Sequence, residues 1–209
     1  RGLGNGYKRQ ADIMMHTMER YFVLEDTMEI TDKIAQDVMK NVMKYAKILK
    51  KDPENYEARA EIMWCGSLSH NGLTGCGTCG GDWATHLMEH ELGGMFDVAH
   101  GAGLAAVWGS WARYVMDEKP ERFAQFAVDV MGVEESDDVK STALKGIEAV
   151  EEFYRMIEMP TNMKELGINP TDEQIKDMAM KATNHDTQQL GAFKKLSAKD
   201  LVEIYKTAK

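Results

Sequence analysis

The chain is poor in the residues that interrupt helices and in the patterns that build sheets. Only four of its 209 residues are proline, and runs of valine, threonine and isoleucine are few. No tract alternates apolar and polar residues over any length, which argues against an extended sheet. Sixteen methionines and a hydrophobic content of 44% are enough for a sizeable core. The sequence therefore predicts an all-α fold, a helical bundle.

Cysteines, basic patches and long apolar runs are also scarce. The three cysteines, Cys65, Cys76 and Cys79, are odd in number and do not form a disulfide framework, which fits a reducing compartment. The net charge of −9 and the absence of a basic patch argue against nucleic acid and anionic membranes as partners. No apolar run approaches the roughly 18 residues that span a bilayer. We therefore expect a cytoplasmic protein.

Helical periodicity and end signals divide the first half of the chain. Helices are expected over 11–24, 30–51, 54–68 and 100–116, with a short helix in DWATHLMEHELGG. Thr31 or Asp32 is expected to cap the second helix, and Pro53 to occupy the first turn of the third. Gly93-Gly94 is expected to stop the short helix.

Clear start and stop signals divide the second half as well. A helix over 120–131 should end at Gly132, and Ser136-Asp137-Asp138 should open a long helix that ends before Pro160. Thr171 and Ser197 are expected to start the last two helices, over 171–183 and 197–208. No internal repeat or low-complexity tract is present.

One set of polar residues has the spacing of a metal site. Asp12 and His16 lie four residues apart in a helical segment, so both side chains point from one face. His86 and His90 repeat that spacing, and His100 follows at the start of the apolar helix. A carboxylate and three imidazoles from Asp12, His16, His86 and His100 suit Fe(II), Zn(II) or Mn(II).

The residue pattern leaves other interpretations open. An Asp-x-x-x-His pair is commonly a surface pair or a helix cap, and His86 with His90 could be a satisfied helix face. His70 and His185 have loop-like surroundings that favour structural or surface roles.

The pair Cys76-x-x-Cys79 could be a redox pair or half of a zinc knuckle. No second such pair and no βαβ context accompany it, which favours two thiols without a role. The glycine-rich stretch around this pair lacks G-x-x-x-x-G-K-[ST] and a preceding strand, so a P-loop is rejected.

Three segments resemble a known family. They are ADIMMHTMERYF, SLSHNGLTG and DWATHLMEHELGGMFDVAHGAGLAAVWGSWARY. They are similar to iron-containing alcohol dehydrogenases, especially the NAD(P)H-dependent butanol dehydrogenases. The pattern H-x(3)-H-x(9)-H followed by G-x-G is specific to that family, and the likeness runs from about Ala11 to the end of the chain.

The resemblance implies a role for each matching residue. Asp12, His16, His86 and His100 match the metal ligands, with Fe(II) as the expected ion and Zn(II) as the alternative. His90 matches a histidine that lies near the nicotinamide and does not bind the metal, so it is the expected catalytic and cofactor-binding residue. Residues 11–209 would form the all-helical C-terminal metal-binding domain. Residues 1–10 would be a remnant or linker from an N-terminal nucleotide-binding domain.

The implied function is interconversion of small primary alcohols and aldehydes with NAD(P)H, by a homodimer or other homo-oligomer. The family holds the dinucleotide on an N-terminal α/β domain that this sequence does not contain. Full activity is therefore not expected from these residues alone. The alternative is a non-catalytic helical metal-binding or interaction module that lacks nucleotide binding.

Overall fold

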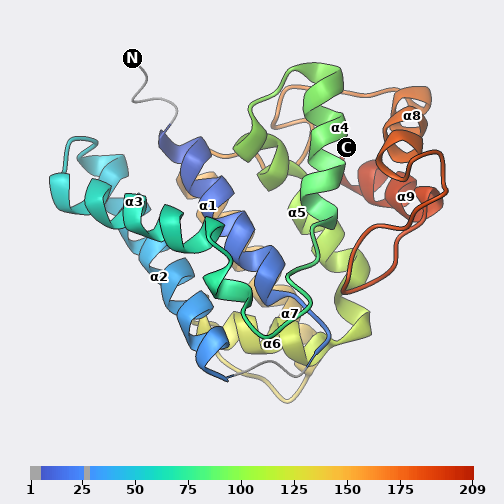
Figure 1. Ribbon diagram of the computed structural model, residues 1–209. Helices are drawn as coiled ribbons and strands as arrows, with labels where there is room; N and C mark the ends of the chain where they lie inside the picture. Colours follow the sequence, from blue (N-terminus) through green and yellow to red (C-terminus); the bar gives the residue numbers. More distant parts are fainter. Residues whose placement is uncertain (1–5, 26–28) are drawn as a thin grey trace.

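A computed structural model describes residues 6–25 and 29–209, and these residues fold as α-helices joined by short connections (Figure 1). The elements are α1 (Gly6–Tyr21), α2 (Glu29–Lys51), α3 (Tyr56–His70), η2 (Leu73–Gly75), α4 (Ala84–Phe96), α5 (His100–Val115), η3 (Met116–Glu118), α6 (Pro120–Asp129), α7 (Val139–Met156), α8 (Asp172–Ala182) and α9 (Ala198–Ala208). Strand-like pairing within the described ranges is limited to one isolated bridge, between Leu190 and Leu196. The all-α prediction is confirmed.

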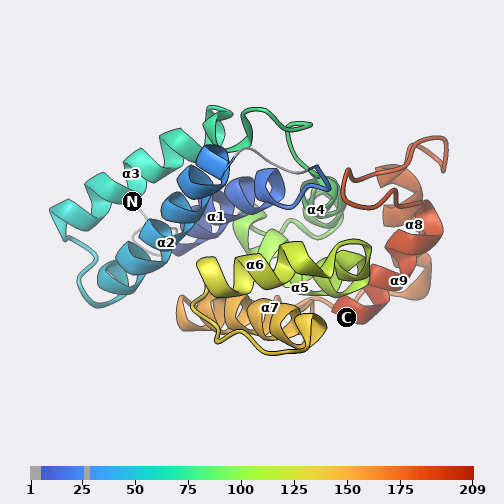
Figure 2. The same ribbon diagram turned by 90° about the horizontal axis from the view of Figure 1, so that it is seen from below.

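Helix α1 runs through the middle of the bundle and packs against α2, α3 and α5. Figures 1 and 2 show α2 and α3 on one side of it and α4 and α5 on the other. Helices α6 and α7 pack together below α1 and α5, and α8 and α9 close the end beyond α4. Residues of α1, α3, α4 and α5 thus approach one another around the end of α3.

Helix α5 forms the centre of the core, as its apolar sequence predicts. Every residue from Gly101 to Ala112 is buried, and Trp108 and Trp111 are 0% exposed. Phe22, just after α1, stacks on Phe123 of α6 with ring centroids 4.3 Å apart and lies against both tryptophans. Burial of each such side chain stabilises the fold by roughly 1.5–3 kcal/mol before entropy is counted.

The predicted starts of the last three helices are confirmed. The side chain of Asp138 accepts a hydrogen bond from the Lys140 amide at the start of α7. Thr171 and Ser197 form capping boxes at α8 and α9, because each hydroxyl binds an amide that would otherwise lack a partner.

Two predicted starts in the first half are wrong. Helix α2 already begins at Glu29, so Thr31 and Asp32 lie inside it. The Thr31 hydroxyl donates to the carbonyl of Cys76 instead of capping the helix. The cap of α3 is Asn55, whose Oδ1 accepts from the Ala58 amide at 3.0 Å, and Pro53 belongs to the preceding turn. The asparagine side chain accepts a hydrogen bond from a free amide of the first turn. A proline has no such acceptor and only fixes the backbone φ angle.

None of the described helices has an apolar stretch long enough to cross a bilayer.

Candidate metal centre

Three helices bring the four predicted ligands together around one carboxylate. Helix α1 supplies Asp12 and His16, α4 supplies His86 and α5 supplies His100. Nε2 of His16 and Nε2 of His86 each lie 3.6 Å from Asp12 Oδ1, and Nε2 of His100 lies 3.4 Å from it. Donor atoms about 2.1 Å from one ion in a tetrahedral arrangement are separated by about 3.4 Å. The three contacts to Asp12 Oδ1 have the length expected between two ligands of one ion. Donor atoms that all lie within 4.8 Å of one another form two sets that share Asp12, one with His86 and His100 and one with His16 and His70.

Two of these atoms lack the partners that burial normally demands. Asp12 Oδ1 and His86 Nε2 are buried, and neither has a hydrogen-bond partner among the described residues. A buried polar atom without a partner costs roughly 1–3 kcal/mol, so native structures seldom leave one unsatisfied. A bound divalent cation would satisfy both atoms, and one oxygen with three imidazoles is a donor set that iron and zinc accept.

A buried glutamate, which the sequence analysis missed, orients His86. Glu19 is 0% exposed, and its Oε2 is hydrogen-bonded to Nδ1 of His86. Its Oε1 accepts from the backbone amides of Thr85 and His86 at 2.8 and 3.2 Å. With the proton fixed on Nδ1, the lone pair of Nε2 points toward Asp12 and is free for a metal.

A second buried glutamate does the same for His100. Oε2 of Glu89, on α4, is hydrogen-bonded to Nδ1 of His100. Glycines make room for it, since a Cβ on Gly103 would lie 2.6 Å from Glu89 Oε1 and one on Gly93 would lie 3.0 Å from it. The prediction that Gly93-Gly94 stops the helix is wrong, because α4 continues to Phe96. Gly93 lies within the helix and lets the Glu89 carboxylate lie beside it.

Charge at the centre is strongly coupled. Burial alone would lower the pKa of His86, but the Asp12 and Glu19 carboxylates outweigh it and raise that pKa to about 9. The neighbouring carboxylates of Asp12 and Glu89 raise the pKa of His100 to about 10. Burial would raise the pKa of Asp12, yet its interactions with His100 and His86 hold that pKa well below its usual range. The pocket thus stabilises positive charge around an ionised Asp12.

His16 has a different environment from the other predicted ligands. Burial, followed by the charges of His86 and His70, lowers its pKa to about 4, so the ring is neutral near pH 7. Its Nδ1 lies 3.5 Å from a guanidinium nitrogen of Arg20, which stacks over Trp83 at 4.6 Å. A neutral imidazole is the form that binds metals.

His90 lies beside the centre without facing Asp12. Its side chain is exposed, and its ring centroid is 6.4 Å from that of His86 and 5.7 Å from that of His100. Among the described residues, a possible ligand atom of His90 lies within 4.8 Å of those of Glu89 and His100, and Asp12 is not part of this set. The role of His90 beside the centre, rather than as a ligand, stays a prediction.

His70 was expected to have a structural or surface role, but it faces the centre. Helix α3 extends to His70, and its Nε2 lies 3.6 Å from the second oxygen of Asp12, Oδ2. Its ring lies against that of His16, with centroids 3.9 Å apart. Of the two histidines assigned to loops, only His70 is near the predicted ligands in the described part of the chain.

The chain is similar in sequence to known proteins over nearly its whole length. Residues 9–209 match the model of the Fe-containing alcohol dehydrogenase family, C-terminal. The chain belongs to the iron-containing alcohol dehydrogenase family. It is 33% identical over 197 residues to NADH-dependent butanol dehydrogenase A of Clostridium acetobutylicum, covering 94% of this chain and 50% of that protein. It is 30% identical over 199 residues to the NADPH-dependent aldehyde reductase YqhD of Escherichia coli, covering 95% of this chain and 50% of the relative.

Solved structures of family members have the same helical fold. The substrate- and cofactor-free form of aldehyde reductase YqhD from E. coli superposes with a TM-score of 0.92 at 27% identity, over 100% of this chain and 54% of that one. NADH-dependent butanol dehydrogenase A from Thermotoga maritima gives 0.88 at 32% identity, over 97% of this chain and 51% of that one. The chain spans about half the length of the curated relatives it matches. The fold class and the resemblance to this family are therefore confirmed.

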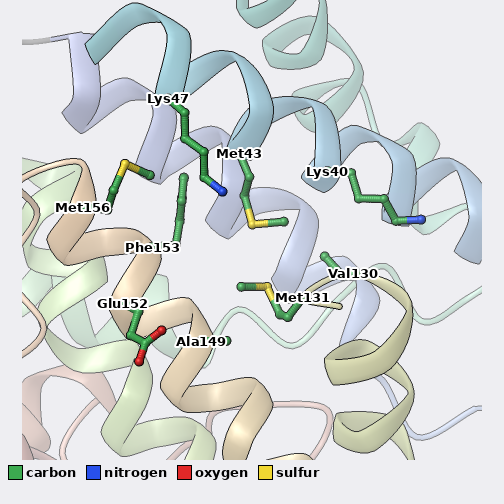
Figure 3. A pocket seen from close by; sticks show the side chains of 9 residues that line it. All are labelled: Lys40, Met43, Lys47, Val130, Met131, Ala149, Glu152, Phe153 and Met156. Atoms are coloured by element: carbon green, nitrogen blue, oxygen red, sulfur yellow. The ribbon is translucent and has the colours of Figure 1, made fainter. Parts of the chain in front are cut away.

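A groove on another part of the surface is separate from these ligands. It measures about 570 Å³ and is lined by α2, α7 and the residues after α6, with Met43, Met131 and Phe153 among its side chains (Figure 3). Lys40 and Lys47 lie along its α2 wall. None of the predicted site residues lines it, so this groove does not take part in the candidate metal centre.

The glycine-rich segment has the spacing of a nucleotide loop in the wrong structural context. Gly75 to Gly80 reads G-x-G-x-x-G, but the stretch follows α3 and η2, whereas the dinucleotide fingerprint follows a strand. Cys76 and Cys79 within it are free and exposed, and the metal-capable groups found among the described residues include no cysteine. The segment does not support a phosphate cradle.

Replacing Glu19 by glutamine should weaken metal binding by roughly 10–100-fold. The amide of Glu19→Gln would donate to Nδ1 of His86, which moves the imidazole proton to Nε2 and removes the lone pair from the centre. Metal affinity measured by chelator competition tests this, with Glu135→Gln, at an exposed position between α6 and α7, as the matched control. Equal affinities of Glu19→Gln and wild type would contradict the role given to Glu19.

Replacing Gly103 by alanine should displace Glu89 and lower metal affinity by about tenfold. The new Cβ would lie 2.6 Å from Glu89 Oε1, so the carboxylate must leave His100. Overpacking of this buried helix should also cost roughly 1–3 kcal/mol of stability. Gly94→Ala is the control, because a Cβ there meets nothing within 4 Å. Chelator competition and thermal unfolding of both variants would separate the two effects.

Proposed function

We propose that this chain is the metal-binding catalytic domain of an NAD(P)H-dependent alcohol dehydrogenase that interconverts small primary alcohols and aldehydes. The observation that carries the proposal is the convergence of three histidine Nε2 atoms on Asp12 Oδ1 at 3.4–3.6 Å. The similarity to a butanol dehydrogenase and an aldehyde reductase supports the substrate class.

Asp12, His16, His86 and His100 would hold the ion. Fe(II) is the metal that the family's description names, and Zn(II) accepts the same donors. When bound, the ion would supply Lewis-acid polarisation of the substrate oxygen, and NAD(P)H would supply or accept hydride. Glu19 and Glu89 keep two of the imidazoles in the tautomer that binds metal.

Besides binding the metal, the chain would transfer a proton to the substrate and shape the substrate pocket. The exposed His90 lies beside His100, within reach of the outer side of the centre. An imidazole nitrogen of His90 would give a proton to the aldehyde oxygen during reduction and take it back during oxidation. The small apolar residues that follow His100 in α5 would border a short aliphatic chain and exclude water.

The second candidate is a helical metal-binding or interaction module without turnover. The observation that favours it is the absence of a strand-linked glycine loop from the described ranges. In the proposed enzyme the nicotinamide would come from a dinucleotide-binding domain of the full-length protein, so turnover would require that domain.

Metal content distinguishes a true centre from a coincidental cluster. We expect the purified chain to hold one equivalent of Fe(II) or Zn(II), and His100→Ala to lose most of it. His185→Ala, an exposed histidine outside the cluster, is the control. Equal metal content in wild type and His100→Ala would refute the proposed centre.

Turnover distinguishes the enzyme from the module. Butyraldehyde reduction would be followed with NADH and with NADPH, using the 209-residue chain and a full-length protein that contains it. Activity of the full-length protein that is lost in His90→Ala, with metal content unchanged, supports the proposed function. Absence of turnover in a metal-loaded full-length protein would favour the module.

A further inference from the structure

We propose that His70 is a fifth protein ligand of the metal centre and binds the ion through Nε2. This inference rests on the proposed centre and extends it beyond the four residues that match the family's pattern. Nε2 of His70 lies 3.6 Å from Asp12 Oδ2, and Asp12, His16 and His70 form a metal-capable group of their own among the described residues.

The neighbours of His70 fix its tautomer. Nδ1 lies 2.9 Å from the carbonyl oxygen of Gly66 and 2.7 Å from the hydroxyl oxygen of Ser69. A carbonyl only accepts hydrogen bonds, so the proton of a neutral His70 ring belongs on Nδ1. The Ser69 hydroxyl lies 3.0 Å from the same carbonyl and can donate to it while accepting from His70. The lone pair of Nε2 is then left facing Asp12.

A lone pair that faces a carboxylate oxygen is repelled unless a cation lies between them. This arrangement repeats what Glu19 does for His86 and Glu89 for His100, since in each case an acceptor on Nδ1 leaves Nε2 free. The place of His70 on the last turn of α3 brings a fourth helix to the centre. Its side chain is 42% exposed, so the ring also borders the open side of the site.

A fifth protein donor changes which ion the centre prefers. Zn(II) favours four ligands in a tetrahedron, whereas Fe(II) and Mn(II) accept six. Five protein donors would leave one position of an octahedron for a substrate oxygen. A centre that includes His70 would therefore favour a six-coordinate ion over closed tetrahedral zinc.

The test compares wild type, His70→Ala and His70→Gln, with His185→Ala as the matched control. Mn(II) affinity is measured by competition with a chelator, and coordination is followed by the visible spectrum of the Co(II)-loaded chain. We expect Mn(II) to bind about tenfold more weakly to His70→Ala. The Co(II) bands should intensify, because fewer ligands remain around the ion. His185→Ala should match wild type in both measurements.

Each outcome decides a different claim. A Co(II) spectrum that is the same in wild type and in both His70 variants would overturn ligation by His70, whether or not affinity falls. Failure of wild type to take up any ion would instead refute the proposed centre itself. Circular dichroism of each variant checks the fold, and His70→Gln, whose amide can keep local hydrogen bonds, serves if His70→Ala is unstable.

Discussion

Replacing Asp12 by asparagine should abolish tight metal binding, with a loss of affinity of at least about 100-fold. An outer-sphere partner of a ligand alone is worth 10–100-fold in metal affinity, and in the proposed centre Asp12 would be a ligand itself. Its carboxylate lies within 3.6 Å of Nε2 of His16, His70, His86 and His100. An uncharged amide cannot balance a dication among so many imidazoles.

The measurement is metal stoichiometry and affinity after reconstitution with Fe(II) without oxygen, or with Zn(II). Asp37→Asn is the control, because Asp37 is an exposed aspartate on α2 whose ion pair with Lys40 is long, at 3.6 Å. The control should bind metal as wild type does. Full retention of metal by Asp12→Asn would show that the cluster does not use this carboxylate, and the proposed function would lose its main support.

Replacing Arg122 by methionine should have the largest effect on stability, at about 3–5 kcal/mol. Arg122 is 5% exposed and makes a two-pronged ion pair with Asp32, with N–O distances of 2.6 and 2.8 Å. It also donates twice to the carbonyl of Tyr21 at the end of α1 and stacks over that ring at 3.7 Å. Methionine fills part of the volume but leaves these buried acceptors without their donor.

Thermal unfolding measures the effect, and the melting temperature should fall by roughly 10 °C. Arg59→Met is the control, since Arg59 is exposed and its side chain donates to the carbonyl of Pro53; a change below about 0.5–1 kcal/mol is expected there. Arg122→Lys should recover only part of the loss, because an ammonium cannot make the paired contacts. An Arg122→Met protein as stable as wild type would mean that packing alone fixes the end of α1.

Helix periodicity and end residues were sufficient to predict much of this fold. Asp138, Thr171 and Ser197 marked helix starts because their oxygens bind free amides whatever the tertiary context. The predictions from Pro53 and Gly93-Gly94 were wrong, because the effect of these residues on a helix end depends on the tertiary contacts around them. Gly93 is inside a helix because a buried carboxylate lies against it, and no local pattern records that contact.

The site was predictable to a similar extent. The spacing of Asp12, His16, His86 and His100 suggested a cluster, and the family resemblance selected it. Glu19 carried a usable signal, since it lies three residues after His16 and seven after Asp12 and so shares their helix face. Glu89 carried a similar signal, since it lies three residues after His86 in one helix, whereas the place of His70 depends on how α3 packs against α1.

All the residues of the proposed metal centre come from the first half of the chain. In the metal-capable groups of the described residues, the last member is His100. The second half instead contacts the segment around His86: the Tyr205 hydroxyl donates to the carbonyl of Met88, and the amides of Ala192 and Phe193 donate to Asp82. Substitutions beyond about position 120 should therefore be tolerated when they preserve side-chain volume and the packing of the helices. Substitutions before that position must also preserve the side chains proposed to bind the metal. Related sequences would then diverge at two different rates on either side of α5.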